Sequence, residues 1–244
     1  MPGLLKPQPS SVRAQIDFLD PLLTEKPFSC LGAPPPGMPA TNIEPYSIGI
    51  RRKKHNAPSA GSARTPENTG PVSRAHNDNT PATGARRVML EMGEEAEELS
   101  KGRCQVCSSP FFGLVDVWHK FKNVRAGQIV NVWRPLAYPA QDCPLAYMDY
   151  RTLNVEQDLR ATDLILSNEG NRKGENYSVL HNPAQKWYFL SNQTPEECIV
   201  FKIYDSLNEP GIAQLTPHSA FVNPTAPHDT PPRQSIEIRA LVFY

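Results

Sequence analysis

One triplet of residues has the types and the spacing of a metal-binding site. His76-Asn77-Asp78 places an imidazole and a carboxylate two positions apart. In an extended segment, residues i and i+2 point to the same side, so both side chains could bind one metal ion. A distant histidine would complete a two-histidine, one-carboxylate set, which leaves positions on iron(II) open for a co-substrate and O₂. His218, in a segment near the last strands, is the best candidate for that ligand.

Other interpretations of the histidines stay open at this point. His181, in a His-Asn-Pro turn, and His228, in the loop Pro227-His228-Asp229, are alternative ligands, although both have the surroundings of loop residues. The His-x-Asp triplet also fits a simple turn in which Asp78 accepts a hydrogen bond from a nearby backbone N–H.

A second constellation could bind a carboxylate. Arg233, Ser235, Glu237 and Arg239 alternate along the last predicted strand and therefore share one face. A guanidinium beside a hydroxyl suits a carboxylate, because the planar fork of arginine binds both oxygens. Arg233 and Ser235 form such a pair, whereas Arg239 lies in the strand interior, where an inward charge needs a partner. The sequence leaves the choice between the two arginines open.

The elements that must position these residues have mainly the period of strands. Short apolar runs are separated by Pro, Asn and Gly, which predicts a mainly β fold, an antiparallel sandwich or barrel. A helical stretch is expected within residues 86–101, with Lys101-Gly102 as its C-terminal stop. The expected strands are 129–133, 145–151, 162–166, 177–180, 187–190, 199–204 and 235–243.

Composition excludes several other classes of protein. Lys+Arg and Asp+Glu are equal at 25 each, so no basic face favours nucleic-acid binding. No apolar stretch approaches the length of a membrane span, and the N-terminus has no secretory signal pattern. Five cysteines without a signal predict a reduced, cytoplasmic protein. Proline, at 26 of 244 residues, disfavours a helix bundle. Oligomeric state is not indicated.

Order is expected to begin near Val72. Residues 1–70 contain few apolar residues and no sustained period, so they are predicted to be a weakly ordered leader to a single domain over 71–244. The basic run Arg51-Arg52-Lys53-Lys54 within this leader is interpreted as a solvated loop.

Several segments resemble, in amino-acid sequence, those of a known family. These segments are Ile129 to Leu136, Pro144-Leu145-Ala146, Asn182-Pro183 to Phe189, and Thr216-Pro217-His218 to Phe243. To them are added His76-Asn77-Asp78-Asn79-Thr80-Pro81, Gly84-Ala85-Arg86-Arg87 and Glu94 to Leu99. They are similar to the AsaB-like fungal hydroxylase/desaturases, which include the gibberellin desaturase and resemble the CmcJ proteins of cephem methoxylation.

The resemblance implies a double-stranded β-helix, or jelly-roll, core and Fe(II)/2-oxoglutarate chemistry. It implies that His76, Asp78 and His218 bind the iron. It also implies that Arg233 or Arg239, assisted by Ser235, binds a carboxylate of 2-oxoglutarate. The expected function is an oxidoreductase that hydroxylates or desaturates a small-molecule intermediate of fungal secondary metabolism. The alternatives are an impaired or accessory homologue without turnover, and a partner subunit in a methoxylation or methyl-transfer step.

The chain departs from the family pattern at two places. The region before the His-x-Asp triplet is shorter than in the family. In addition, residues 106–128 separate two segments that are adjacent in the family, so they are predicted to be an insert. We hypothesise that this insert is a translated, unspliced intron.

Overall fold

Alternating apolar residues place the strands in two antiparallel sheets that face each other. The computed structural model describes residues 42–53, 70–95, 104–105, 127–166 and 172–243. The first sheet contains, in order, β1 (Asn42–Arg52), β11 (Gln234–Phe243), β4 (Gly127–Pro135) and β3 (Cys104–Gln105), and β9 (Ile199–Asp205) also pairs with β4. The second contains β6 (Leu159–Leu166), β7 (Arg172–Val179), β2 (His76–Asn77), β10 (His218–Ala220), β5 (Leu145–Met148) and β8 (Trp187–Phe189).

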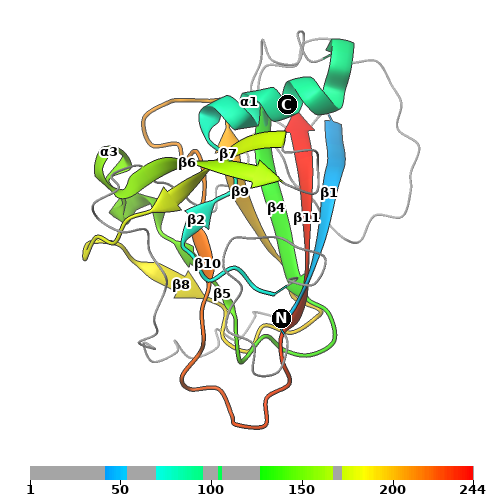
Figure 1. Ribbon diagram of the computed structural model, residues 1–244, viewed down its shortest axis with the longest axis vertical. Helices are drawn as coiled ribbons and strands as arrows, with labels where there is room; N and C mark the ends of the chain where they lie inside the picture. The colour runs from blue at the N-terminus through cyan, green and yellow to red at the C-terminus, as the bar shows by residue number, and fades with distance from the viewer. Residues whose placement is uncertain (1–41, 54–69, 96–103, 106–126, 167–171, 244) are drawn as a thin grey trace, which may run out of the picture.

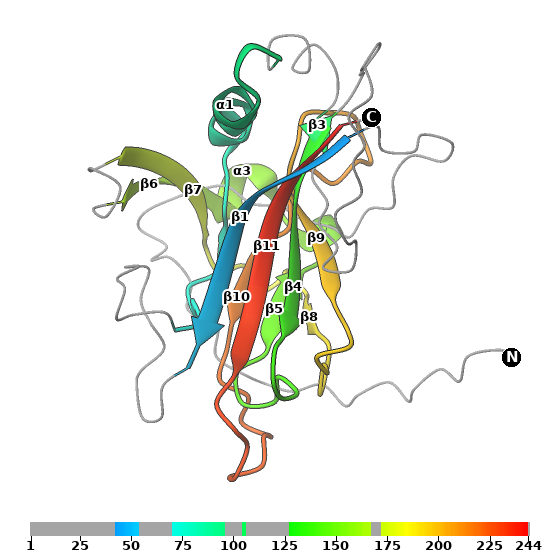
Figure 2. The same cartoon turned by 90° about the vertical axis from the view of Figure 1, so that its right-hand side faces the viewer.

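The main hydrophobic core lies between these sheets. Trp133 and Phe201 enter it from the first sheet, and Leu145 and Tyr147 enter it from the second. The rings of Tyr147 and Phe201 meet edge-on, with centroids 5.0 Å apart. Figure 2 shows β1, β11, β4 and β9 as one layer, with β10, β5 and β8 behind it. The prediction of a mainly β fold is confirmed.

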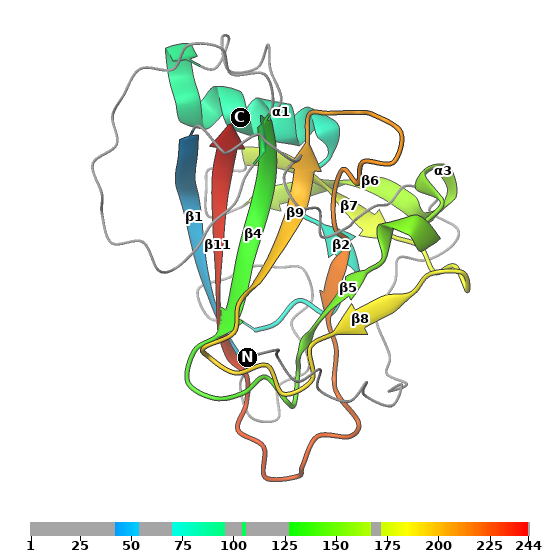
Figure 3. The same cartoon turned by 180° about the vertical axis from the view of Figure 1, so that it is seen from behind.

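The helices are few and short. They are α1 (Pro81–Met92), α3 (Val155–Asp158) and the 3₁₀ turns Gly93–Glu95 and Tyr150–Thr152. Helix α1 lies at the end of the molecule where β11 finishes (Figure 1, Figure 3). No helix in the described ranges is long and apolar enough to cross a membrane.

The predicted helix over 86–101 was placed too far along the chain. Helix α1 begins five residues earlier because Thr80 caps it: Thr80 and Thr83 form a reciprocal capping box, and Pro81 occupies the first turn. It ends at Met92, where Gly93 takes a positive φ of 56°. The remainder of the predicted helix, 96–101, lies outside the described residues.

The prediction of a weakly ordered leader over 1–70 is wrong for residues 42–53. These residues include β1, which pairs with β11 in a register that runs from Asn42 opposite Phe243 to Arg52 opposite Gln234. β1 is an edge strand with one face in water, where Ile48 is 68% exposed and Ile50 is 47% exposed. A strand of this kind needs few buried apolar residues, since its backbone hydrogen bonds come from its neighbour. Residues 1–41 and 54–69, and the predicted insert up to residue 126, lie outside the described ranges.

Two very short strands carry the two histidines of the predicted metal site. Strand β2 contains two residues and β10 contains three, and neither was predicted as a strand. They pair with each other so that His76 and His218 are directly opposite. The second sheet thus brings together two residues that are far apart in the sequence.

Candidate active site

His76, Asp78 and His218 converge between the two sheets. The rings of His76 and His218 have centroids 4.5 Å apart. The Nε2 atom of His76 lies 3.8 Å from Oδ1 of Asp78, and Nε2 of His218 lies 3.9 Å from Oδ2. One possible ligand atom from each residue lies within 4.8 Å of the other two. The structure therefore brings the three predicted ligands to one point.

The backbone fixes the orientation of both imidazoles in the same way. Nδ1 of His76 donates to the carbonyl oxygen of Arg74 at 2.7 Å, and Nδ1 of His218 donates to that of Thr216 at 2.9 Å. A carbonyl oxygen only accepts, so the proton of each neutral ring is held on Nδ1. The lone pair is then on Nε2, the atom that faces Asp78, as in histidines that ligate metals.

Burial keeps His76 in the neutral form that a metal requires. Desolvation, and secondly the neighbouring His218, lower the pKa of His76 to about 3. A neutral imidazole can donate its Nε2 lone pair without first losing a proton. Two imidazoles and one carboxylate are the donor set of non-haem iron(II) sites, so the residues present fit iron(II).

Three donors hold the carboxylate of Asp78. Arg239 donates to Oδ2 through Nε at 3.1 Å and through Nη2 at 2.9 Å, and Asn131 donates to the same oxygen at 2.9 Å. Nη2 of Arg239 also contacts Oε1 of Glu237 at 2.5 Å. Arg239, one of the two candidate arginines, is therefore engaged by two carboxylates.

The other candidate, Arg233, is in a different situation. It is 4% exposed, its Nε donates to Oγ of Ser235 at 3.1 Å, and its Nη1 donates to the carbonyl oxygen of Cys143 at 2.7 Å. Its guanidinium lies over the ring of Trp133, 5.0 Å from the centroid. Within the described part of the chain no carboxylate forms an ion pair with it. Burial of this charge lowers the pKa of Arg233, and a bound anion would offset that desolvation.

Tyr147 lies next to this site, and the sequence did not single it out. Its hydroxyl is buried, and no described residue gives it a hydrogen-bond partner. Tyr147 lies opposite His218 in the pairing of β5 with β10, and its ring is buried between the sheets. A buried hydroxyl without a partner is costly, so its position favours a polar ligand. Its strand was predicted, but a single tyrosine among apolar residues gave no functional signal.

Several of these groups line one pocket. Its apolar walls are Val72, Trp133 and Leu145, and its polar residues are Arg51, His76, His218, Arg233, Glu237 and Arg239. The interpretation of the basic run 51–54 as a solvated loop is wrong for Arg51. This residue belongs to β1 and lines the pocket.

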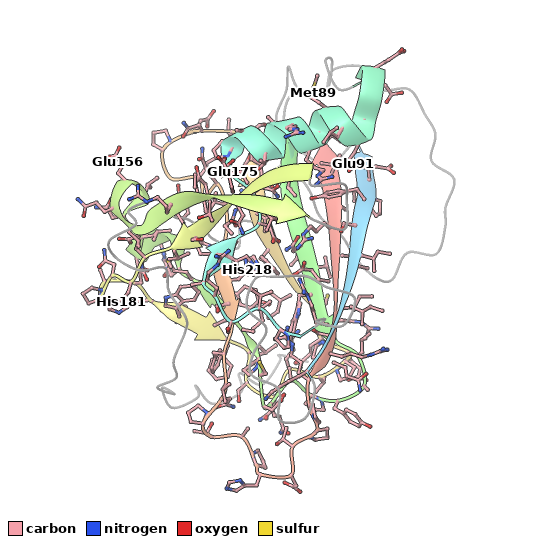
Figure 4. All side chains as sticks on the ribbon, in the orientation of Figure 1. Met89, Glu91, Glu156, Glu175, His181 and His218 are labelled. Atoms are coloured by element: carbon pink, nitrogen blue, oxygen red, sulfur yellow. The ribbon has the colours of Figure 1, made fainter. Side chains whose placement is uncertain are left out.

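The alternative ligands lie elsewhere. Both His181 and His228 are exposed, and neither belongs to the group that could hold a metal. Figure 4 shows His218 within the body of the protein and His181 at its edge. His55 and His119 lie outside the described residues.

The sequence matches a family model described as "Oxidoreductase/YMDC permease-like domain" over residues 38–125 and 114–243. The match begins before β1, so family-related sequence includes part of the predicted leader. Among curated relatives, aspirochlorine biosynthesis protein N of Aspergillus oryzae is 39% identical over 68% of this chain and 58% of its own length. The Fe(II)/2-oxoglutarate-dependent dioxygenase nvfI of Aspergillus novofumigatus is 33% identical over 71% of the chain and 52% of its own length.

Hydroxylase/desaturase asaB of Aspergillus flavus is 34% identical over 48% of this chain and 55% of its own length. A solved structure of the iron and α-ketoglutarate-dependent endoperoxidase NvfI superposes with a TM-score of 0.65 at 28% identity. It covers 84% of this chain and 61% of the solved one. The fold is thus the jelly roll of iron and 2-oxoglutarate oxygenases, as expected. The chain spans little more than half the length of these curated relatives.

Proposed function

Because this chain belongs to the oxidoreductase/YMDC permease-like domain family and has hydroxylase/desaturase homologues, we propose that it is an oxidoreductase of fungal secondary metabolism. It uses Fe(II), 2-oxoglutarate and O₂ to hydroxylate or desaturate a small molecule. One observation carries this proposal: His76 and His218, which form a possible metal-binding group with Asp78, line the same pocket as Arg233.

His76, Asp78 and His218 would hold the iron. Each imidazole presents Nε2, because its Nδ1 proton is donated to a backbone carbonyl. Arg239 and Asn131 orient the carboxylate of Asp78. Iron, when bound, supplies the oxidising chemistry that protein side chains lack. The chain's own part is to fix the ligand geometry and to line the site with Trp133 and Leu145, which exclude water.

Arg233, Ser235 and Tyr147 would bind the distal carboxylate of 2-oxoglutarate. Arg233 has no carboxylate partner in the described ranges, whereas Arg239 has Asp78 and Glu237. The Tyr147 hydroxyl lacks a hydrogen-bond partner there as well. A carboxylate accepting from both would satisfy the tyrosine and neutralise the buried guanidinium. This argument favours Arg233 over Arg239 for the co-substrate.

Turnover of the co-substrate tests the proposed activity without a known substrate. The purified protein is supplied with Fe(II), 2-oxoglutarate and air, and succinate is measured over time. Iron-dependent succinate formation is expected; it should be lost in His76→Ala and His218→Ala and retained in His181→Ala, which changes an exposed histidine. Binding of iron and 2-oxoglutarate without succinate in every preparation would favour the accessory homologue instead. Succinate formation that survives both site variants would overturn the proposed ligands.

We also propose that residues 106–128 are an insert in the family domain. In support, the family model matches in two parts, and the parts overlap within this segment. The sequence of the mature transcript tests the intron hypothesis: a spliced message lacking these codons is expected. A mature message that retains them contradicts it.

A further inference from the structure

The pocket contains more positive charge than its own carboxylates balance. Arg51, Arg233 and Arg239 line it, and Glu237 lines it beside them. Asp78 is the second carboxylate at the site and pairs with Arg239. Three guanidinium groups therefore face two carboxylates.

The proposed iron and co-substrate leave this imbalance unchanged. The two positive charges of Fe(II) equal the two negative charges of 2-oxoglutarate. The nearby pair of Lys53 and Asp142 is neutral in itself, with Nζ 2.9 Å from Oδ2. Arg74, two residues before His76, adds positive charge, and its buried Nε has no hydrogen-bond partner among the described residues. The loaded site would still carry excess positive charge.

Arg51 is the pocket arginine that neither the proposed iron site nor the proposed 2-oxoglutarate site uses. In the register of β1 with β11 it lies opposite Ser235, so it is on the same inner face as the Arg233 site. The described residues supply neither a hydrogen bond nor an ion pair to its guanidinium. Burial lowers the pKa of Arg51, and Glu237 is the first of the charges that oppose this effect. Glu237 is already in contact with Arg239.

Arg51 and Arg233, the two pocket arginines that are not paired with Asp78, differ in how deeply they are buried. Arg233 is buried against the Trp133 ring, where a small, flexible diacid such as 2-oxoglutarate could reach it. Arg51 is only half-buried, on the edge strand of the sheet. A group bound there would belong to a second molecule that enters after the co-substrate.

We propose, on the basis of the function proposed above, that Arg51 binds a carboxylate of the small-molecule substrate, so that the preferred substrates are acids. The planar guanidinium fork matches both oxygens of a carboxylate. The bound acid supplies the negative charge that the site lacks, and it also fixes one end of the substrate relative to the iron ligands.

Calorimetry on matched acids and esters tests this proposal. The probes are terpenoid, polyketide and aromatic carboxylic acids, each paired with its own methyl ester, titrated into the protein with and without Fe(II) and 2-oxoglutarate. We expect the best acids to bind about tenfold or more tightly than their esters, the scale of one charge-assisted hydrogen bond. Arg51→Gln should remove this preference, and Arg51→Lys should keep part of it. Arg52→Gln, which changes an exposed arginine on the same strand, should behave like the wild type.

Three results would overturn the role of Arg51. The first is that the wild type shows no preference for acids over esters, or binds no acid at all. The second is that the preference survives Arg51→Gln. The third is that Arg51→Gln loses as much 2-oxoglutarate affinity as Arg233→Gln. The last result would assign Arg51 to the co-substrate. An acid preference in the metal-free protein that depends on Arg51, without binding of 2-oxoglutarate, would instead sink the proposed function and keep Arg51 as a carboxylate site.

Discussion

Arg239 and Asp78 join the two sheets at the proposed iron site. The arginine comes from β11 in the first sheet, and it donates two hydrogen bonds to Oδ2 of Asp78, which directly follows β2 in the second. Asn131 lies opposite Arg239 in the register of β4 with β11 and donates to the same oxygen. Two facing residues of one sheet therefore orient a proposed metal ligand from the other.

Arg239→Gln should weaken metal binding. The substitution removes the charge that faces Asp78 and leaves the carboxylate less well oriented, and losses of about 10–100-fold in metal affinity are typical for such partners. Titration with Fe(II) or Co(II) under argon measures the affinity, and circular dichroism reports folding. Arg239→Lys should lie between Arg239→Gln and the wild type. An unchanged affinity in folded Arg239→Gln would show that the contact does not position the ligand.

Arg233→Gln and Tyr147→Phe should weaken 2-oxoglutarate binding while metal affinity stays near that of the wild type. The arginine change removes the buried cation, so the larger loss is expected there. The tyrosine change removes one hydroxyl and should cost about 1 kcal/mol, the contribution of one hydrogen bond. Dissociation constants from calorimetry with Mn(II) in place of iron check both. Equal 2-oxoglutarate affinity in all three proteins would contradict the assignment of the distal carboxylate.

Gly84→Ala should destabilise the fold. A Cβ at Gly84 would lie 2.4 Å from the ring of Tyr204, because α1 packs directly on that side chain. Overpacking of this kind costs about 1–3 kcal/mol. Gly174→Ala is the matched control, since its new Cβ would meet only ordinary contacts at 3.7 Å. Urea denaturation compares the free energies of unfolding. Equal destabilisation in the two variants would mean that the contact with Tyr204 is not responsible.

Local spacing was enough to predict which residues lie together on one strand. The alternation of Arg233, Ser235, Glu237 and Arg239 placed them on one face, and the pocket includes three of them. The two-residue spacing of His76 and Asp78 likewise predicted that they lie together, as they do. Each of these inferences needed only the two-residue period of extended chain.

Contacts across the two sheets could not be predicted in this way. The bond between Asp78 and Arg239 joins residues 161 positions apart, and nothing local to either residue indicates it. Arg51 was assigned to a loop because β1 buries few apolar side chains and derives its order from β11. Tyr147 gained its significance only when β5 paired with β10. Tertiary pairing, rather than local pattern, decided these positions.

Anaerobic absorption spectroscopy tests the proposed iron site most directly. Fe(II) and then 2-oxoglutarate are added to the protein under argon, and the weak visible charge-transfer band of 2-oxoglutarate coordinated to iron(II) is followed. We predict a saturable band in the wild type and in His228→Ala, which changes an exposed loop histidine, and its loss in His76→Ala, Asp78→Ala and His218→Ala. No band in the wild type, or a band of full strength in the three site variants, would contradict the site.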